Sequence, residues 1–145
     1  MDKTRTDAIN QLFLQYRRTF ESGDAQQIAD FYRFPLHYYP ERCGKQSANR
    51  TQFTAQVNRL LSIYGRLGVS QIVGAVTQIS ELNTCSNLVE LRWVLLRREG
   101  DSSVELYTAT TRYLVSDTPA GLKIDGLIAV DEKACIRRAL AGASP

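Results

Sequence analysis

The spacing of apolar residues changes near Gly68, and this change constrains the fold more than any other feature of the sequence. Before Gly68, apolar side chains recur at three- and four-residue steps, as on an amphipathic helix. After it, β-branched and apolar residues alternate with polar ones, as on a strand. The pattern predicts helices over about 5–22, 24–33 and 49–66, and long strands over about 69–82, 88–98, 104–115 and 122–130.

Capping residues mark where the predicted helices begin and end. Gly23 can adopt the left-handed conformation that closes a helix, and Asp24 can cap the next one. Asn49 with Gln52 predicts a capping box at the third helix. Pro35 requires the second helix to end by Phe34. We expect a loop or an irregular short hairpin over 41–48, and one terminal helical turn over 134–141.

The order of these elements, helices first and short-looped strands afterwards, is typical of an α+β layer and not of a parallel βαβ sheet. The chain has 145 residues, of which 43% are hydrophobic, so we expect a single globular domain over residues 1–145.

The charge distribution argues against nucleic acid as a partner. The formal net charge is only +3, and the basic residues form dispersed pairs, Arg17-Arg18, Arg97-Arg98 and Arg137-Arg138, instead of one patch. No apolar stretch approaches the roughly 20 residues that cross a bilayer, and no signal-peptide core follows Met1. We therefore expect a cytoplasmic protein that binds neither nucleic acid nor membrane.

The cysteines indicate neither a disulfide nor a metal site. Cys43, Cys85 and Cys135 are odd in number and widely spaced, without a C-x-x-C pair, and His37 is the only histidine. We expect the cysteines to be small, partly buried apolar residues, and we expect no metal and no cofactor.

Several segments resemble the nuclear transport factor 2-like superfamily, which includes the SnoaL-like cyclases and the ketosteroid isomerases. The resemblance rests on Tyr16 to Asp24, the helix from Ala25 to Tyr32, the third helix, and Ala120-Gly121-Leu122-Lys123-Ile124, which is similar to a common Gly-Trp-Lys-Ile turn of that family. The resemblance implies an α+β cone, in which a strongly curved, mostly antiparallel sheet surrounds three N-terminal helices. The open end of such a cone is a ligand pocket, and the outer sheet face often dimerises.

The same resemblance argues against ketosteroid isomerisation. Tyr16 stands seven residues before Gly23, the offset at which those isomerases place a tyrosine that donates to an oxyanion. Their carboxylate base would fall at about Tyr39, and their second, acidic donor near Ala109 or Thr110, so both acids are missing. Without the base there is no proton-transfer step.

His37 is the other candidate for catalysis, because histidine is the residue type that most often serves as an acid or base in enzymes at physiological pH. His37 belongs to the aromatic run from Phe34 to Pro40, which is predicted to be a strand. Phe34, Leu36 and Tyr38 share one face of it, and Pro35, His37 and Tyr39 share the other. Either face could line the pocket. Catalysis by Tyr16 and His37 requires that both side chains reach the same cavity.

Alternation on the later strands predicts which side chains face inward. Trp93 belongs to an uninterrupted apolar face, and Tyr107 shares the matching face of the next strand. Arg112 is a mid-strand charge that could bind an anionic ligand or pair across the sheet with a solvated partner. The opposite, outer face of these strands is also apolar, and its members are Val94, Leu96, Leu106 and Leu114. This predicts either a homodimer that covers the face or a monomer with scattered apolar residues on its surface.

These observations favour a protein that binds a small apolar or aromatic molecule in the cone. Two alternatives stay open: a cofactor-independent SnoaL-like cyclase, isomerase or dehydratase, and an accessory homodimer that uses the outer sheet face. The predicted ligand-binding residues are Tyr16, Tyr32, Tyr39, Trp93, Tyr107 and Arg112, with Tyr16 and His37 as the catalytic candidates.

Overall fold

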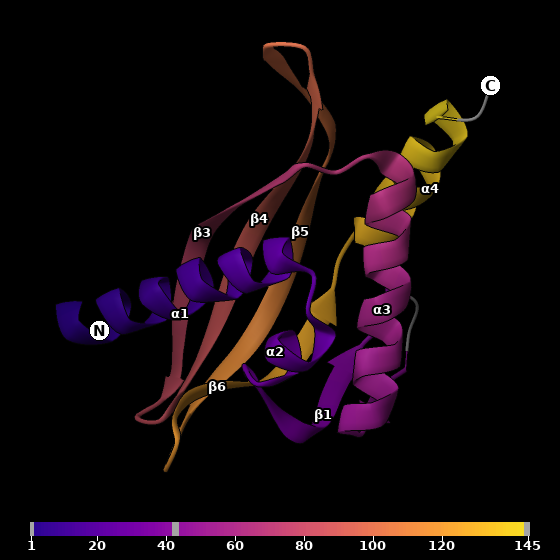
Figure 1. Ribbon diagram of the computed structural model, residues 1–145. Helices are drawn as coiled ribbons and strands as arrows, with labels where there is room; N and C mark the ends of the chain where they lie inside the picture. Colours follow the sequence, from indigo (N-terminus) through magenta and orange to yellow (C-terminus); the bar gives the residue numbers. More distant parts are fainter. Residues whose placement is uncertain (1, 42–43, 144–145) are drawn as a thin grey trace.

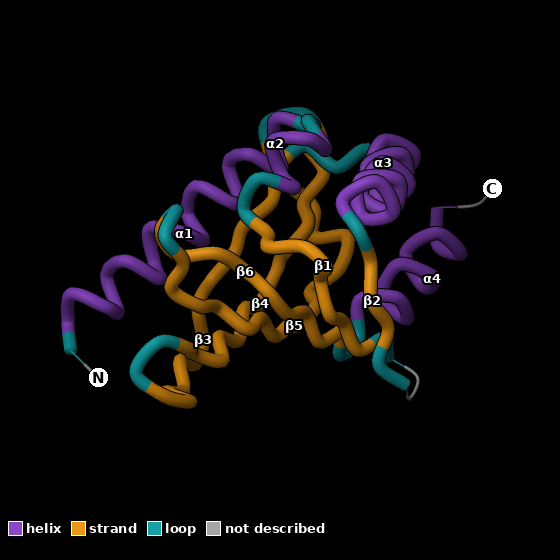
Figure 2. Tube along the Cα trace, turned by 90° about the horizontal axis from the view of Figure 1, so that it is seen from below, coloured by secondary structure: helices purple, strands orange, loops and turns teal. Residues whose placement is uncertain are grey.

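The computed structural model describes residues 2–41 and 44–143. The body of the molecule is a curved six-stranded sheet with helices along its inner side (Figure 1). The view from below shows the sheet curling beneath α1, α2 and α3, with α4 beside it (Figure 2). The predicted α+β cone is therefore confirmed. The elements, in chain order, are α1 (Lys3–Ser22), α2 (Ala25–Ala29), β1 (Tyr32–Tyr39), β2 (Gln46–Ala48), α3 (Arg50–Leu67), β3 (Gln71–Asn83), β4 (Ser86–Glu99), β5 (Ser102–Thr118), β6 (Gly121–Ala129) and α4 (Glu132–Ala143).

The strands lie in the order β2-β1-β6-β5-β4-β3. Neighbouring strands are antiparallel except β1 and β6, which run parallel. The sheet is thus mostly antiparallel, as predicted. β4 and β5 are the longest pair, and opposite residues on them, such as Trp93 and Ala109, face the helices together.

The predicted caps of α1, α2 and α3 are present. Gly23 closes α1 with φ 76°, and the Asp24 carboxylate accepts hydrogen bonds from the backbone N–H groups of Gln26 and Gln27. At α3, Asn49 and Gln52 form both hydrogen bonds of the capping box, at 2.8 and 2.9 Å. Local sequence predicted these caps correctly because each cap satisfies backbone N–H or C=O groups within its own helical turn.

Other boundaries differ from the prediction. The second helix was expected to reach residue 33, but α2 ends at Ala29 and Tyr32 already belongs to β1. Pairing with β6 explains the difference, since Ile124 N donates to Phe31 O at 2.8 Å and Tyr32 stands opposite Ile124. Residues 46–48 form β2, paired with β1, and the single turn expected near 134–141 is a full helix, α4.

A contiguous core fills the space between the helices and the sheet. The predicted inward face is confirmed, because Trp93 of β4 is buried, as are Tyr107 and Tyr113 of β5. The hydrophobic residues with no exposed surface are aliphatic and come from both layers: Ile9, Ile28, Ala29, Val89, Leu95, Val115 and Ile124. The aromatic residues lie among them.

Candidate functional site

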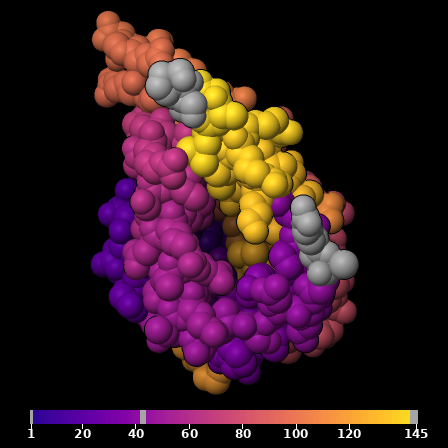
Figure 3. All heavy atoms as spheres, turned by 90° about the vertical axis from the view of Figure 1, so that its right-hand side faces the viewer, coloured from indigo at the N-terminus to yellow at the C-terminus, as the bar shows by residue number. Residues whose placement is uncertain are grey.

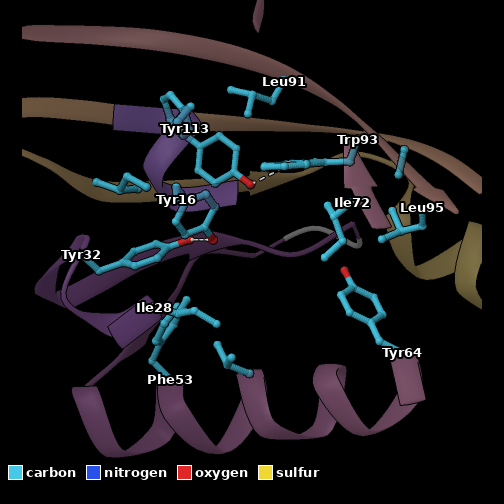
Figure 4. Close-up of a cluster of buried hydrophobic side chains, with 14 of the residues drawn as sticks. Tyr16, Ile28, Tyr32, Phe53, Tyr64, Ile72, Leu91, Trp93, Leu95 and Tyr113 are labelled. Carbon is cyan, nitrogen blue, oxygen red and sulfur yellow. Dashed lines mark hydrogen bonds between the residues drawn. The ribbon is translucent and has the colours of Figure 1, made fainter. Parts of the chain in front are cut away.

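Polar groups from six different elements converge inside this apolar core. We call them the interior polar cluster, and Figure 4 shows several of its side chains turned toward one another. Its members are Tyr16 of α1, Tyr32 of β1, Tyr64 of α3, Trp93 of β4, Tyr107 and Tyr113 of β5, and Glu132 of α4. A core that needed only to be stable would be better built from apolar side chains, because buried polar groups require partners.

Two hydrogen bonds join the aromatic side chains nearest to α1. The hydroxyl groups of Tyr16 and Tyr32 lie 2.6 Å apart, and Trp93 Nε1 donates to Tyr113 Oη at 3.1 Å (Figure 4). Burial raises the pKa of Tyr16, Tyr32 and Tyr113 well above its ordinary value of 10.0. These phenols therefore keep their protons at neutral pH and act as hydrogen-bond donors.

The remaining members surround the carboxylate of Glu132. Tyr107 Oη donates to Glu132 Oε2 at 3.2 Å, and Tyr64 Oη donates to the same oxygen at 3.4 Å. Tyr64 lies in the last turn of α3, and Glu132 is the first residue of α4. The packing of α4 beside β5 and α3 therefore assembles this group from three distant segments.

The surroundings of Glu132 disfavour its negative charge. Burial raises the pKa of the Glu132 carboxyl above its ordinary value of 4.5, the hydrogen bonds from Tyr107 and Tyr64 partly offset this, and the nearby charges of Glu41 and Asp131 raise it further. Among the described residues, no lysine, arginine or histidine is buried, and Glu132 takes part in no ion pair. A carboxyl group with a raised pKa and phenol partners can accept or release a proton, or bind a cation.

The surface is hollowed next to this group. Figure 3 shows the hollow between α3, in magenta, and α4, in yellow. Tyr64 lies on α3 and Glu132 on α4, and the members of the interior polar cluster other than Glu132 are all buried, with 3% to 8% of their surface exposed. Glu132 is half-buried. The carboxylate end of the cluster is therefore the end that a ligand could reach.

Two other concave surfaces lie away from most of the cluster. A groove of about 600 Å³ runs between β5 and α4, where Arg97 and Arg138 contribute to its lining and Tyr107 is the single cluster member. A smaller one, of about 390 Å³, lies between α1 and β3. The larger groove contains two polar contacts, from Cys135 Sγ to Thr108 O at 3.4 Å and from Arg138 Nη2 to Cys135 Sγ at 3.4 Å. Unlike the interior, it does not join a carboxylate to phenol hydroxyls among the described residues.

The structure brings four of the predicted site residues together. Tyr16, Tyr32, Trp93 and Tyr107 all belong to the interior polar cluster, although Tyr32 reaches it from a strand and not from the predicted helix.

The other three predicted site residues lie elsewhere. Tyr39 is 41% exposed at the end of β1. His37 Nδ1 lies 3.2 Å from Ser47 Oγ of β2, and because neighbouring strand residues alternate, His37 faces away from the side on which Leu36 is buried. Arg112 lies on the outer face, where its Nε donates to Glu90 Oε1 at 3.0 Å.

These placements do not fit two expectations. The His37 ring and the Tyr16 hydroxyl do not meet, because Tyr16 is held in the core by Tyr32 while His37 is held at β2. Arg112 does not line the interior, because it alternates with Thr111 and Tyr113, both of which point inward. Arg112 pairs instead with Glu90 across the sheet, which matches the alternative that a mid-strand charge has a solvated cross-strand partner.

The sequence analysis identified neither Glu132, the carboxylate of the cluster, nor Tyr64 as a site residue. One signal was available for Glu132: the acidic pair Asp131-Glu132 follows directly after the last predicted strand. Side chains at such a strand end can point into the open end of a curved sheet. For Tyr64 the pattern carried no signal, because tyrosine on an apolar helix face also fits simple packing.

Metal ligands and membrane spans are not found in the part of the chain that the structure describes. No group of three His, Cys, Asp or Glu side chains there could hold a metal ion, and no helix there has the length and apolar character to cross a membrane. Cys85 is exposed and Cys135 is buried, both as free thiols, while Cys43 lies outside the described residues.

A curved, mostly antiparallel sheet around helices defines the class of cone-shaped α+β proteins. The family model described as NTF2-like protein (DUF6841) matches residues 6–132. The chain therefore belongs to this NTF2-like family, and the resemblance noted in the sequence is confirmed. Among curated proteins, none matches this sequence.

Solved structures show the same fold at low sequence identity. An NTF2-like protein of unknown function from Shewanella oneidensis is 19% identical, with a TM-score of 0.68 over 88% of this chain and 99% of that one. A cystatin-like domain of unknown function from Nostoc punctiforme is 14% identical, with a TM-score of 0.69 over 99% and 90%. A candidate dehydratase of the NTF2-like family from Streptomyces avermitilis is 12% identical, with a TM-score of 0.65 over 90% and 97%.

Proposed function

We propose that this protein binds a small, largely apolar molecule at the open end of the cone, in the hollow between α3 and α4, where the Tyr64, Tyr107 and Glu132 end of the interior polar cluster would meet the polar group of the ligand. The observation that carries the proposal is the meeting of Tyr64, Tyr107 and Glu132 from three separate elements, two of which, α3 and α4, border the hollow (Figure 3). Ligand sites typically combine many apolar and aromatic side chains with a few convergent polar groups. The interior has this composition.

Packing alone explains the cluster less well. The carboxyl group of Glu132 disfavours burial, and replacing it with an apolar side chain would remove that cost. The position of Glu132 beside two phenols therefore supports a role in binding. Phenol hydroxyls and a carboxylate together offer both donors and acceptors to a ligand.

Trp93 provides a direct test, because it is the only tryptophan of the chain and lies in the cluster. We expect a neutral aromatic probe such as naphthol to change the Trp93 emission saturably. Tyr64→Phe is expected to weaken this binding about 3- to 10-fold, since it removes one hydroxyl at the open end.

Arg112→Ala is the matched control, because Arg112 lies on the outer face. It is expected to leave the affinity unchanged. A change in emission that rises linearly with probe concentration, or that is equally strong in the Tyr64→Phe variant, would count against the interior site.

Glu132 also supports a second candidate, a cofactor-independent dehydratase, isomerase or cyclase. Its raised pKa suits a general base that takes a proton from carbon, and Tyr64 or Tyr107 could donate a proton to a leaving hydroxyl, which departs as water. One structural neighbour is a candidate dehydratase. Mass spectrometry of a bound compound after incubation separates the two: loss of water or rearrangement indicates catalysis, and an unchanged compound indicates binding.

A homodimer through the outer sheet face is a further proposal. Val94, Leu96, Leu106 and Leu114 are half-buried in the single chain and lie on β4 and β5. A partner subunit would cover the apolar surface that they leave exposed. Sedimentation at micromolar concentration tests this, and a mass near 16.3 kDa would contradict it.

A further inference from the structure

We propose that the groove between β5 and α4 is a second binding site, which takes a small molecule with an apolar body and a carboxylate group. The guanidinium group of Arg138 and the backbone N–H of Thr108 bind the carboxylate. This inference goes beyond the proposed function, because neither Tyr64 nor Glu132 is among the described residues that line the groove.

The groove has the size and the lining of a small-molecule site. Its volume of about 600 Å³ lies within the range of roughly 300–1,000 Å³ that ligand pockets span. Apolar side chains and two arginines contribute to its lining: Val104, Leu106, Ala139, Arg97 and Arg138. Such a lining can cover an apolar body while it binds an anionic group.

Arg138 supplies a positive charge that belongs to none of the four ion pairs formed within residues 2–41 and 44–143. Its Nη2 donates to Cys135 Sγ at 3.4 Å, which holds the guanidinium group beside the groove. Burial raises the pKa of the Cys135 thiol above its ordinary value of 9.0, so the sulfur is a neutral and weak acceptor. The charge and the other donors of Arg138 therefore stay available to a carboxylate.

Arg97 brings a second guanidinium group from the end of β4. Its stem lies against Gly68, where a Cβ atom would come within 3.0 Å of Arg97 Cδ. Its Nη2 donates to Glu99 Oε1 at 2.6 Å. Because the charge of Arg97 is already paired, we assign the direct contact with the ligand to Arg138.

The edge of β5 supplies the backbone donor. β6 pairs with β5 from Thr111 to Thr118, and before this stretch the edge of β5 faces α4. Thr108 O accepts from Cys135 Sγ at 3.4 Å, so the carbonyl group of Thr108 points toward α4. The N–H and C=O groups of one residue in an antiparallel strand point to the same side. The Thr108 N–H therefore also points toward α4, and no acceptor for it is found in the described part of the chain.

The same edge favours a small molecule over an added peptide strand. The pairing of β5 with β4 skips Leu106, and such a bulge interrupts the regular edge that an added strand needs. Thr108 O is occupied by Cys135, and Thr110 N donates to Asp131 Oδ1 at 2.8 Å. A continuous ladder of backbone hydrogen bonds with a peptide would require these two groups.

Naphthoate and naphthamide test the charge, because they share one ring system and differ in the anionic group. Isothermal titration calorimetry with the intact protein measures the affinity of each probe. We expect naphthoate to bind saturably and about fivefold or more tightly than naphthamide. Arg138→Gln is expected to abolish this advantage, and Arg138→Lys to keep part of it, since an ammonium group retains the charge without the planar fork.

Arg137→Gln is the matched control, because it makes the same chemical change at the preceding residue of α4, which is not among the described lining residues. Both arginines are exposed, so we expect both variants to fold. Arg137→Gln is expected to leave the affinity for naphthoate unchanged. Glu105→Gln is expected to raise it about twofold, because Glu105 also lines the groove and its charge opposes an anion.

Three results would overturn the inference: no saturable binding of naphthoate, equal affinity for naphthoate and naphthamide, or an equal effect of Arg138→Gln and Arg137→Gln. A fourth is a loss of naphthoate affinity in Tyr64→Phe as large as that in Arg138→Gln, because it would place the carboxylate in the hollow between α3 and α4. The proposed function is tested separately by naphthol, so its failure and the failure of this inference are distinguishable.

Discussion

Replacing Trp93 with alanine is expected to lower the free energy of unfolding by about 3–5 kcal/mol. The indole is only 6% exposed, donates to Tyr113, and has its ring centre 6.1 Å from that of Tyr16. Truncation removes apolar contacts, leaves a cavity in the core, and takes the donor away from the Tyr113 hydroxyl. Urea unfolding followed by circular dichroism measures the loss, because the variant has no tryptophan to report.

Leu82→Ala is the control for this measurement. Leu82 is also a large apolar residue of a strand, but it is 53% exposed, so we expect a change within about 0.5 kcal/mol. A loss below about 1 kcal/mol for Trp93→Ala would mean that the indole is not packed into the core as the structure places it.

Replacing Gly74 with alanine is expected to lower the free energy of unfolding by about 1–3 kcal/mol, although alanine has the higher strand propensity. Gly74 of β3 stands directly opposite Trp93 of β4. A Cβ atom at Gly74 would lie 2.5 Å from Cζ3 and 2.9 Å from Cε3 of the indole, so the ring must shift. Because Tyr16 and Tyr113 hold the other sides of the ring, we also expect the Trp93 emission to change.

A double-mutant cycle isolates this contact. In a Trp93→Leu background the ring is gone, so Gly74→Ala should cost much less, and we expect a coupling energy of about 1 kcal/mol or more. Equal costs in both backgrounds would contradict the steric explanation.

Gly65→Ala provides the matched glycine control. A Cβ atom at Gly65 meets no heavy atom within 4 Å, and the residue lies within α3. Here we expect alanine to raise the free energy of unfolding by about 0.4–1 kcal/mol, because it reduces the conformational freedom of the unfolded chain.

Local sequence signals predicted the parts of the fold that depend on short-range interactions. The caps at Asp24 and Asn49 and the inward face of Trp93 belong to this group. Each depends on residues within a few positions along the chain, where periodicity and capping chemistry act directly. The predicted end of α2 was wrong because Tyr32 pairs with β6, about 90 residues away, and this pairing outweighed the helical pattern.

The candidate site was predictable only in part, for a related reason. Trp93 and Tyr107 were found because they face inward from regular strands, and Tyr16 was found through its offset from Gly23 in the family resemblance. His37 and Arg112 attracted attention as the polar side chains of their strands, yet the structure pairs them with Ser47 and Glu90 outside the interior. A single sequence shows that a side chain is polar, but not which neighbour satisfies it.

The sequence by itself determined the order of helices and strands, their caps, and the inward alternation of β4 and β5, because these follow from spacing along one segment. Only the tertiary structure decided that Tyr64, Tyr107 and Glu132 meet. The position of α4 beside β5 and α3 brings them together, and helix placement depends on contacts between distant segments that no local pattern encodes.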